Sequence, residues 1–247
     1  MKLGCASWCF SWESPFEGAV VSVGKLGFKG TELIATRETD LTEYYSRKMI
    51  SKLREIIESY GMIVSEFALG GSFWWDRGLN SFDKEEKRKA TEQFKRGVQI
   101  AKDLGTRIIC TVAHWPIGIQ TPIPYPPSYL YPTRNGYPQS SYSPKLTMKF
   151  PKDFDWKKTW ENYVQSVGTC TDIASDNGLL FAIEGHLNVI VATTDAFLRL
   201  YDEIKSNSLG MNYDTGWQFI QREYVPLSIL KLSEKLFHVH IRDGDGI

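Results

Sequence analysis

The strongest constraint on the fold of this chain is a repeated unit: a short apolar or β-branched run, a loop, and then an amphipathic helical pattern. Strict alternation of strand and helix predicts parallel strands joined by right-handed crossovers. The 247 residues match the usual length of one α/β barrel. We therefore predict a single α/β domain over residues 1–247, folded as a (β/α)8 barrel. The strand candidates are Leu3–Trp8, Gly30–Ile34, Met62–Ala68, Arg107–Ala113, Leu179–Glu184, Gly210–Asp214 and Leu236–Ile241.

Helical periodicity fills the intervals between the predicted strands. In the clearest pattern, apolar residues recur at spacings of three and four between Leu41 and Tyr60, and similar patterns span 90–104 and 156–174. Glycine follows four of the predicted helices, where a left-handed backbone favours a residue without a Cβ atom. These glycines are Gly27, Gly61, Gly105 and Gly178. A doubly wound open sheet is the alternative fold, but no Gly-x-Gly-x-x-Gly motif follows the first predicted strand.

Two parts of the chain depart from this repeat. The segment 116–151, after the fourth predicted strand, is rich in Pro, Tyr and Ser, and its prolines exclude a regular helix or a central strand. We expect it to form an ordered cover over the barrel mouth or a subunit contact; the alternative is a flexible surface insertion. The sequence also stops soon after the seventh predicted strand. A closed barrel of this type needs eight strands, each followed by a helix. We therefore expect the eighth strand and the last helix to be missing from the chain as given.

Charge and composition narrow the classes of partner. Lys+Arg and Asp+Glu both number 29, and a net charge of zero removes the electrostatic argument for a nucleic-acid or membrane partner. We find no secretory signal and no apolar run of membrane length. Cys5, Cys9, Cys110 and Cys170 are too few for a disulfide framework, so we expect reduced thiols and a cytoplasmic location. Cys5 and Cys9 could form half of a zinc site, but no second pair completes it.

Polar side chains end three consecutive predicted strands. Glu184 and His186 lie two apart at the end of the fifth, Asp214 ends the sixth, and His238 and His240 lie two apart on the seventh. Residues two apart in a strand share a face, and neighbouring strands are about 4.8 Å apart. Two carboxylates and an imidazole suit Mn²⁺, Mg²⁺, Co²⁺ or Zn²⁺, with positions left for substrate or water. We therefore predict a site for one divalent metal ion; the alternative is three unrelated polar strand ends.

Four short motifs, taken in their order and spacing, resemble the xylose isomerase-like barrel superfamily, the sugar isomerase/epimerase and endonuclease IV-like group. The motifs are Gly27–Leu33, Phe181–His186, Met211–Gly216 and Phe237–Asp243. The resemblance implies that Glu184, Asp214 and His240 are the metal ligands. The family's fourth ligand, a Glu on the eighth strand, has no counterpart in this sequence.

Two further departures from the family bear on the substrate. Many relatives carry His three residues after the sixth-strand Asp, at a position that contacts the substrate, and this chain has Trp217 there. The long Pro/Tyr-rich segment is not general to the family either. Together these departures predict an unusual substrate.

The resemblance implies a metal-dependent sugar isomerase or epimerase, with Mn²⁺ as the expected ion. Such enzymes remove a proton beside a carbonyl, which gives an enediolate, and Glu184 or His186 is the expected base. The alternative is a lyase that cleaves C-glycosides by elimination from a 3-keto-glycoside, since the aromatic-rich segment suits a flat aglycone. An endonuclease IV-like enzyme needs more histidines and a basic surface, whereas this chain has four histidines. A non-catalytic barrel subunit stays open because the fourth ligand is absent.

Several other residues are candidates for binding the substrate. His114 ends the fourth strand and either binds substrate or is a hydrogen-bonded histidine at the rim. The tryptophan candidates either stack on a sugar or aglycone or pack at the rim. His238 could instead support His240, and Glu32, at the end of the second strand, either orients polar groups or forms a salt bridge. The candidates for substrate binding are His114, Trp217, His238, Trp8 and Trp115.

The expected partners follow from the predicted chemistry. We expect a small carbohydrate as substrate, no nucleic acid and no membrane. We expect a homo-oligomer, or a hetero-oligomer if the chain is a lyase. Asp243 and Asp245, at the end of the sequence, are expected to cap a loop.

Overall fold

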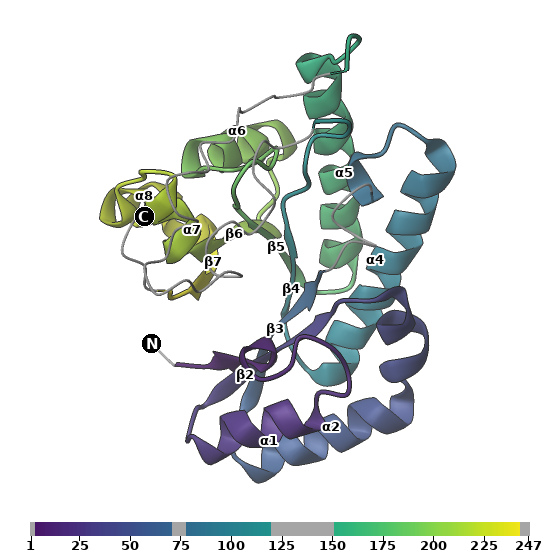
Figure 1. The fold of residues 1–247 in the computed structure, drawn as a ribbon, viewed down its shortest axis with the longest axis vertical. Helices are drawn as coiled ribbons and strands as arrows, with labels where there is room; N and C mark the ends of the chain where they lie inside the picture. The colour runs from purple at the N-terminus through teal and green to yellow at the C-terminus, as the bar shows by residue number, and fades with distance from the viewer. Residues whose placement is uncertain (1–2, 71–77, 120–150, 243–247) are drawn as a thin grey trace, which may run out of the picture.

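Seven parallel strands, hydrogen-bonded in the order of the chain, form an open half-barrel in the computed structural model, which describes residues 3–70, 78–119 and 151–242. Figure 1 shows the strands curving around a common centre with the helices outside them. The predicted α/β barrel architecture is confirmed, and β1 and β7 are the edges of the sheet. The strands are β1 (Cys5–Ala6), β2 (Gly30–Ala35), β3 (Ile63–Leu69), β4 (Ile108–Val112), β5 (Leu180–Glu184), β6 (Leu209–Asp214) and β7 (Leu236–His240).

Helices connect consecutive strands and cover the outer face of the sheet. Apolar residues of the sheet and the helices pack into one core, in which Phe94 of α4 contacts Phe181 of β5 with ring centroids 4.8 Å apart. None of the helices in the described ranges combines the length and apolar character needed to cross a membrane. The helices are α1 (Glu17–Lys25), α2 (Arg47–Ser59), α4 (Lys84–Leu104), α5 (Trp156–Asp176), α6 (Thr194–Ile204), α7 (Thr215–Ile220) and α8 (Val225–Leu232).

Local sequence signals explain where these helices begin and end. The Asp83 side chain accepts hydrogen bonds from the backbone N–H groups of Glu85 and Glu86 and starts α4, as N-cap residues do. Asp155 starts α5 and Thr193 starts α6 in the same way. The four glycines predicted to follow helices all have positive φ angles, between +62° and +82°. That part of the sequence prediction is confirmed.

The helical pattern from Leu41 to Tyr60 is not one helix, which corrects the predicted periodicity. A wide turn spans Asp40–Tyr44, the chain then extends at Ser46, and Ser46 caps α2. The break lies at Tyr45 and Ser46, where the backbone leaves the helical region. The Ser46 side chain accepts the backbone N–H of Met49, so a new helix begins there.

Two smaller differences concern aromatic residues. The first predicted strand is only two residues long, because a single 3-10 turn begins at Ser7 and carries Trp8. Trp156, placed on the buried face of α5 by its spacing, is exposed at the first turn of the helix. Trp160 and Tyr163, one and two turns later, are buried as predicted.

The described residues on the two sides of 120–150 lie close together. Gly118 lies so close to Pro151 that a Cβ atom added at Gly118 would be 2.7 Å from the proline ring. Gly118 follows the end of β4, six residues after Val112. Residues 120–150 lie outside the described ranges, so the predicted cover or subunit contact stays a prediction.

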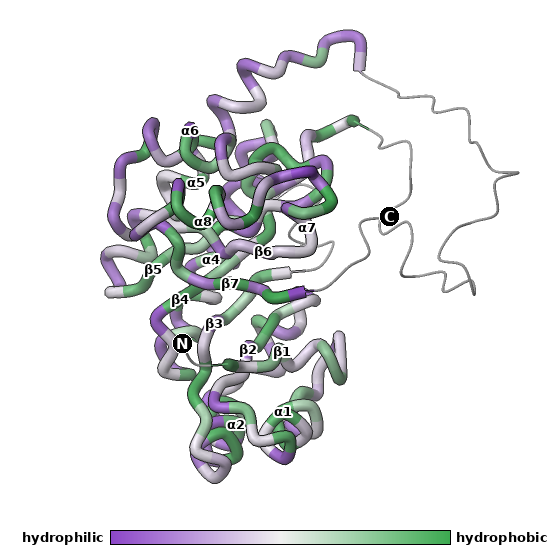
Figure 2. Tube along the Cα trace, turned by 90° about the vertical axis from the view of Figure 1, so that its left-hand side faces the viewer, coloured by the Kyte–Doolittle hydropathy of each residue, from purple (hydrophilic) through white to green (hydrophobic). Residues whose placement is uncertain are grey.

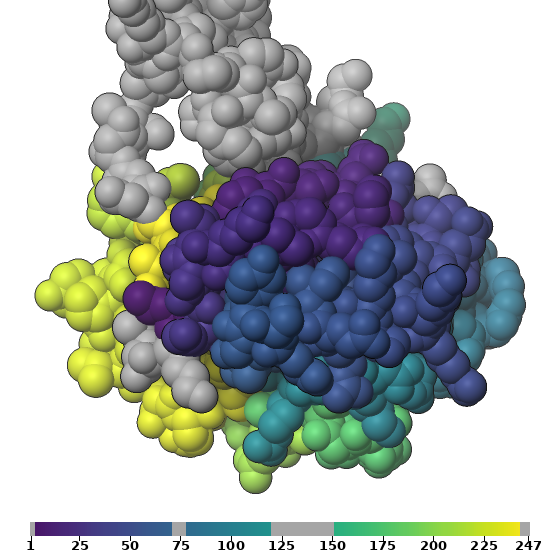
Figure 3. All heavy atoms as spheres, turned by 90° about the horizontal axis from the view of Figure 1, so that it is seen from below, coloured from purple at the N-terminus to yellow at the C-terminus, as the bar shows by residue number. Residues whose placement is uncertain are grey.

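The two ends of the described chain lie beside one another. Figure 3 shows purple N-terminal residues against yellow C-terminal ones, and the rings of Trp8 and His240 are 6.1 Å apart. The open half-barrel therefore curves far enough to bring β7 near β1 and β2.

Candidate metal centre

Three side chains converge where β5, β6 and β7 end. Nδ1 of His240 lies 3.6 Å from Oε1 of Glu184 and 3.8 Å from Oδ2 of Asp214. Both carboxyl groups are almost fully buried. The three residues predicted from strand-end positions thus form one compact group of possible metal ligands. The possible metal-ligand groups among the described residues include no cysteine. All four cysteines are free thiols.

A local irregularity in the β6–β7 pair brings two of these residues opposite each other. The register passes from Met211 opposite Leu236 directly to Asn212 opposite His238, so that Asp214 stands opposite His240. Such bulges re-aim the side chains that follow them. Asn212 consequently stands opposite His238, two residues before the pair Asp214 and His240, and Figure 2 shows β6 and β7 side by side in the sheet.

Gly185 allows a close contact immediately after Glu184. A Cβ atom at this position would be 2.6 Å from Nε2 of Gln218 and 2.9 Å from the backbone oxygen of Ala192. Any larger residue would collide with the backbone of Ala192, in the segment between β5 and α6, and with the Gln218 side chain of α7. The glycine between Glu184 and His186 therefore lets the segment after β5 and helix α7 pack closely beside the end of β5.

Asp214 carries three roles at once. It ends β6. Its Oδ1 accepts the backbone N–H of Trp217 at 2.9 Å and so caps α7. It also forms an ion pair with Arg242, whose Nη2 lies 3.0 Å from Oδ2 of Asp214. Burial and the nearby charge of Glu184 raise the pKa of Asp214, although Arg242 acts in the opposite direction. Two carboxylates this close are costly without further positive charge, and a divalent cation would supply it.

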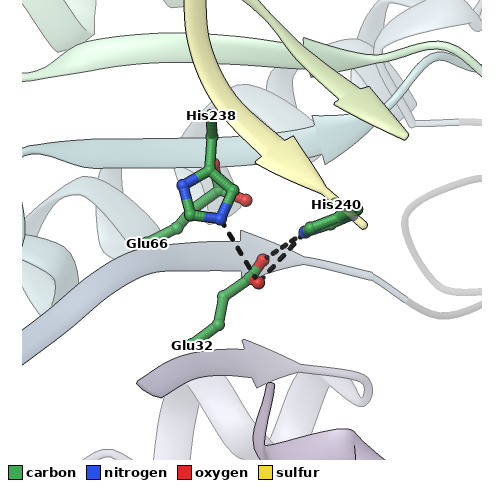
Figure 4. Close-up of side chains that lie close together, drawn as sticks. All are labelled: Glu32, Glu66, His238 and His240. Carbon is green, nitrogen blue, oxygen red and sulfur yellow. Dashed lines mark hydrogen bonds and ion pairs between the residues drawn. The ribbon is translucent and has the colours of Figure 1, made fainter. Parts of the chain in front are cut away.

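A second polar cluster lies directly behind His240 (Figure 4) and consists of Glu32, Glu66, His238 and His240. Nε2 of His240 lies 3.1 Å from Oε1 and 3.0 Å from Oε2 of Glu32. Nε2 of His238 is 3.8 Å from the same carboxylate. His240 thus faces carboxylates with both of its ring nitrogens.

Burial and neighbouring charges shift the pKa values of this second cluster in opposite directions. Burial disfavours the charged form of His240, but Glu32 and Glu184 outweigh it and hold its pKa well above the usual range. Burial would likewise raise the pKa of Glu32, yet the charge of His240 lowers it. Glu66 has the opposite balance, because burial and the charge of Glu32 hold its pKa well above the ordinary value. The directions of these pKa shifts thus favour a charged pair between Glu32 and His240 and the protonated form of Glu66.

Asn212 links Glu66 to His240 within the second cluster and was not identified from the sequence. Its Nδ2 donates to Oε1 of Glu66 at 3.0 Å and lies 3.2 Å from Nε2 of His240. Asn212 stands two residues before Asp214, so strand alternation puts both on one face. That spacing was the available signal, as it was for the pair Glu184 and His186. Glu66 gave a weaker signal, since it lies inside a strand and not at its end.

His186 belongs to a group of tilted aromatic rings beside the site rather than to either ligand group. Its ring centroid is 3.8 Å from that of Trp217 and 5.8 Å from that of Trp115. The guanidinium carbon of Arg242 lies over the Trp217 ring, 4.3 Å from its centroid. Nδ1 of His186 accepts the backbone N–H of Leu187 at 2.8 Å, and burial lowers the pKa of His186 to about 4. His186 is therefore neutral near pH 7, with its proton on Nε2.

The remaining candidates contact different parts of the barrel. Trp8 borders His240, as described above. His114 is fully buried and packs 5.8 Å from the ring of Tyr163. His238 points into the barrel toward Glu32 and Glu66 (Figure 4). Their predicted roles in substrate binding stay predictions, and Asp243 and Asp245 lie outside the described residues.

The donor set fits a divalent metal ion. Two carboxylates and one imidazole are hard or borderline ligands, and three protein ligands leave coordination positions for a substrate. Among the described residues, this group supplies three ligand atoms.

Comparison with known families agrees with this geometry. Residues 21–246 match the model of the family described as xylose isomerase-like TIM barrel. The chain belongs to that family. The family barrel accounts for the parallel sheet with its helices on the outside. No curated protein sequence matches this member of the family.

Solved structures share the fold of this family member. A D-psicose 3-epimerase from Clostridium cellulolyticum H10, solved with D-tagatose, has a TM-score of 0.72 at 20% identity; the match covers 97% of this chain and 72% of the other. The 3-keto-D-glucoside 4-epimerase of E. coli has a TM-score of 0.71 at 17% identity, covering 98% and 79%. A probable 3-DHS dehydratase from Bacillus anthracis has a TM-score of 0.69 at 17% identity, covering 98% and 73%. At these identities the likeness shows the fold alone.

Proposed function

We propose that this chain is a divalent-metal-dependent sugar isomerase or epimerase, with Mn²⁺ as its ion. The observation that carries the proposal is the convergence of Glu184, Asp214 and His240, with Nδ1 of His240 3.6 Å and 3.8 Å from the two carboxylates. These residues come from the ends of three adjacent parallel strands, where active sites of barrel enzymes lie. Sugar epimerases among the structural neighbours make this chemistry the natural first candidate.

Glu184, Asp214 and His240 would hold the ion. When bound, the ion supplies positive charge that stabilises negative charge developing on the substrate oxygens, by several kcal/mol in typical cases. Arg242 would keep Asp214 ionised and in place, because it contacts that carboxylate through two nitrogens, at 3.0 Å and 3.2 Å. The side chains are thus already oriented toward one point.

We assign the base to Glu184 and not to His186. A base needs an unprotonated atom that reaches the substrate, and Nδ1 of His186 is occupied by the backbone N–H of Leu187. The other nitrogen of His186 carries the proton in the neutral ring. His186 can therefore donate a hydrogen bond to a substrate carbonyl, and a carboxylate oxygen of Glu184 can remove the proton beside that carbonyl. The product of this step is an enediolate, which reprotonation on another carbon or face converts to the isomer.

A lyase acting on 3-keto-glycosides is the second candidate. It is favoured by the fold's likeness to a 3-keto-D-glucoside 4-epimerase and to a probable dehydratase, whose reaction class is an elimination. Such a lyase begins with the same proton abstraction, and the aglycone then leaves from the neighbouring carbon. The rings of Trp115 and Trp217 on either side of His186 would suit a flat aglycone.

Solvent exchange tests both candidates together. The Mn²⁺-loaded protein is incubated in D₂O with a series of ketoses and with 3-keto-glycosides. We expect deuterium to appear at the carbon beside the carbonyl, with Glu184→Gln abolishing this exchange and His186→Gln slowing it. Epimer formation identifies the first candidate, and release of the aglycone identifies the second. Turnover of a substrate without exchange and without a primary isotope effect at that carbon would refute proton abstraction.

A further inference from the structure

We propose that Glu32 is a positioning residue of the metal centre, whose carboxylate accepts a hydrogen bond from Nε2–H of His240 and thereby directs Nδ1 toward Glu184 and Asp214. This inference rests on the proposed metal-dependent function. It assigns to a β2 residue a role in a site whose ligands all come from β5, β6 and β7.

The geometry around the His240 ring carries the proposal. Both oxygens of Glu32 lie within hydrogen-bond distance of Nε2, at 3.0 Å and 3.1 Å, while the carboxylates of Glu184 and Asp214 lie on the Nδ1 side. A neutral imidazole has one protonated nitrogen and one free lone pair, and the hydrogen bond at one nitrogen decides which is free. A carboxylate that accepts from Nε2 therefore leaves Nδ1 as the ligand atom.

The fold holds Glu32 firmly in this position. Glu32 is 3% exposed, and a register shift after Thr31 sets it opposite Glu66 on β3 rather than opposite Ser65. Glu66 is anchored in turn by Asn212 at 3.0 Å. The carboxylate of Glu32 is thus supported from its own side of the barrel and reaches across the interior to β7 (Figure 4).

A second metal ion in the deeper cluster is the competing explanation, because Glu32, Glu66, His238 and His240 also form a group of possible ligands. With an ion on each side, His240 would have to bind through both nitrogens and lose both ring protons. Removing the second proton from an imidazole is far harder than removing the first. In addition, one oxygen of Glu66 already accepts from Asn212. A hydrogen bond at Nε2 satisfies the cluster without either difficulty.

Metal titration of four proteins tests the proposal: wild type, Glu32→Gln, Glu66→Gln and Glu184→Gln, each stripped with a chelator and titrated with Mn²⁺. We expect Glu32→Gln to weaken binding by about 10- to 100-fold, the usual effect of losing such a supporting partner. Glu66→Gln is the matched control, the same change in the neighbouring buried carboxyl group. It should weaken Mn²⁺ binding less than Glu32→Gln, because Glu66 and Glu32 share a hydrogen bond that the new amide can still donate. Circular dichroism and thermal unfolding verify that each variant is folded.

Nitrogen NMR supplies a readout that general destabilisation would not change. The chain has only four histidines, so the imidazole nitrogens of the Zn²⁺-loaded protein can be assigned individually. We expect His240 to show a protonated Nε2 and a metal-bound Nδ1, with the Nε2–H signal shifted downfield in wild type and less so in Glu32→Gln. A metal-bound Nε2, or two tightly bound ions per chain, would overturn the proposal.

The same experiments separate this inference from the proposed function. If wild type binds no ion, or if Glu184→Gln binds as tightly as wild type, the metal centre itself is wrong and the role of Glu32 fails with it. If Glu184→Gln loses the ion while folded Glu32→Gln binds as tightly as wild type, only the positioning role is wrong.

Discussion

Nε2 of His240 lies 3.0 Å from Oε2 of Glu32, although 208 positions separate the two residues in the chain. The contact joins β7, at one edge of the open sheet, to β2, next to the other edge. It therefore crosses the barrel interior and brings the first half of the chain into contact with the proposed metal centre, whose candidate ligands all come from the second half. The contact also gives the same histidine two different carboxylate environments.

Removing any one of the three ligands should weaken metal binding. We expect Glu184→Gln, Asp214→Asn and His240→Ala each to lower the affinity for Mn²⁺ at least tenfold, as loss of a ligand does. Glu234→Gln is the control, because Glu234 lies exposed just before β7. Metal analysis after dialysis, together with titration calorimetry, measures the effect. Wild-type occupancy in all three variants would exclude the site.

Asp40 should matter for stability and not for metal binding. Its buried carboxylate accepts the backbone N–H groups of Thr36 and Arg37 at 2.9 Å and the hydroxyl of Ser14 at 2.7 Å. Asp40→Ala leaves these donors without their acceptor, so we expect the free energy of unfolding to fall by about 2–4 kcal/mol. The exposed Asp202 offers the control Asp202→Asn, which should stay within about 0.5 kcal/mol of wild type. Urea unfolding measures the free energy of unfolding of both variants. Equal midpoints for the two would contradict the predicted role of the Asp40 carboxylate in stability.

Two glycines should respond in opposite directions to the same substitution. Gly105 ends α4 with φ +81°, where an alanine is strained, so Gly105→Ala should cost about 1–2 kcal/mol. Gly18 lies in α1 with nothing within 4 Å of an added Cβ, so Gly18→Ala should stabilise by about 0.5 kcal/mol. Thermal unfolding of the pair against wild type compares them directly. Destabilisation by both to the same extent would show that backbone conformation is not the cause.

His186 should make the metal-free protein sensitive to acid. Burial lowers the pKa of His186 from 6.5 to about 4, so between these values the unfolded chain binds a proton that the folded chain does not. The stability is therefore complete above pH 6.5 and is lost as the pH falls toward 4, by up to about 3 kcal/mol. His186→Gln removes the titrating group, and with it this part of the loss of stability. Chemical unfolding in the presence of a chelator at pH 7.5 and pH 4.5 should show a smaller loss in the variant; equal losses would disprove the assignment.

The sequence alone determined the architecture and part of the site. Alternation of strand and helix patterns is a local property, and local periodicity predicted the parallel barrel and the glycines that follow its helices. Glu184, Asp214 and His240 were found in the same way, because a polar residue at the end of an apolar strand stands out from its neighbours. The site predicted from them remains to be tested by the experiments above.

Only the tertiary structure decided how these residues are partnered. The bulges after Thr31 and Met211 set Glu32 opposite Glu66 and Asp214 opposite His240, and a shift of register leaves no mark in the strand sequence. The contact between Glu32 and His240 depends on how far the sheet curves, which is a property of all seven strands together. Periodicity along one strand determines which face a side chain occupies, but the residue it meets across the barrel depends on the packing of the whole sheet.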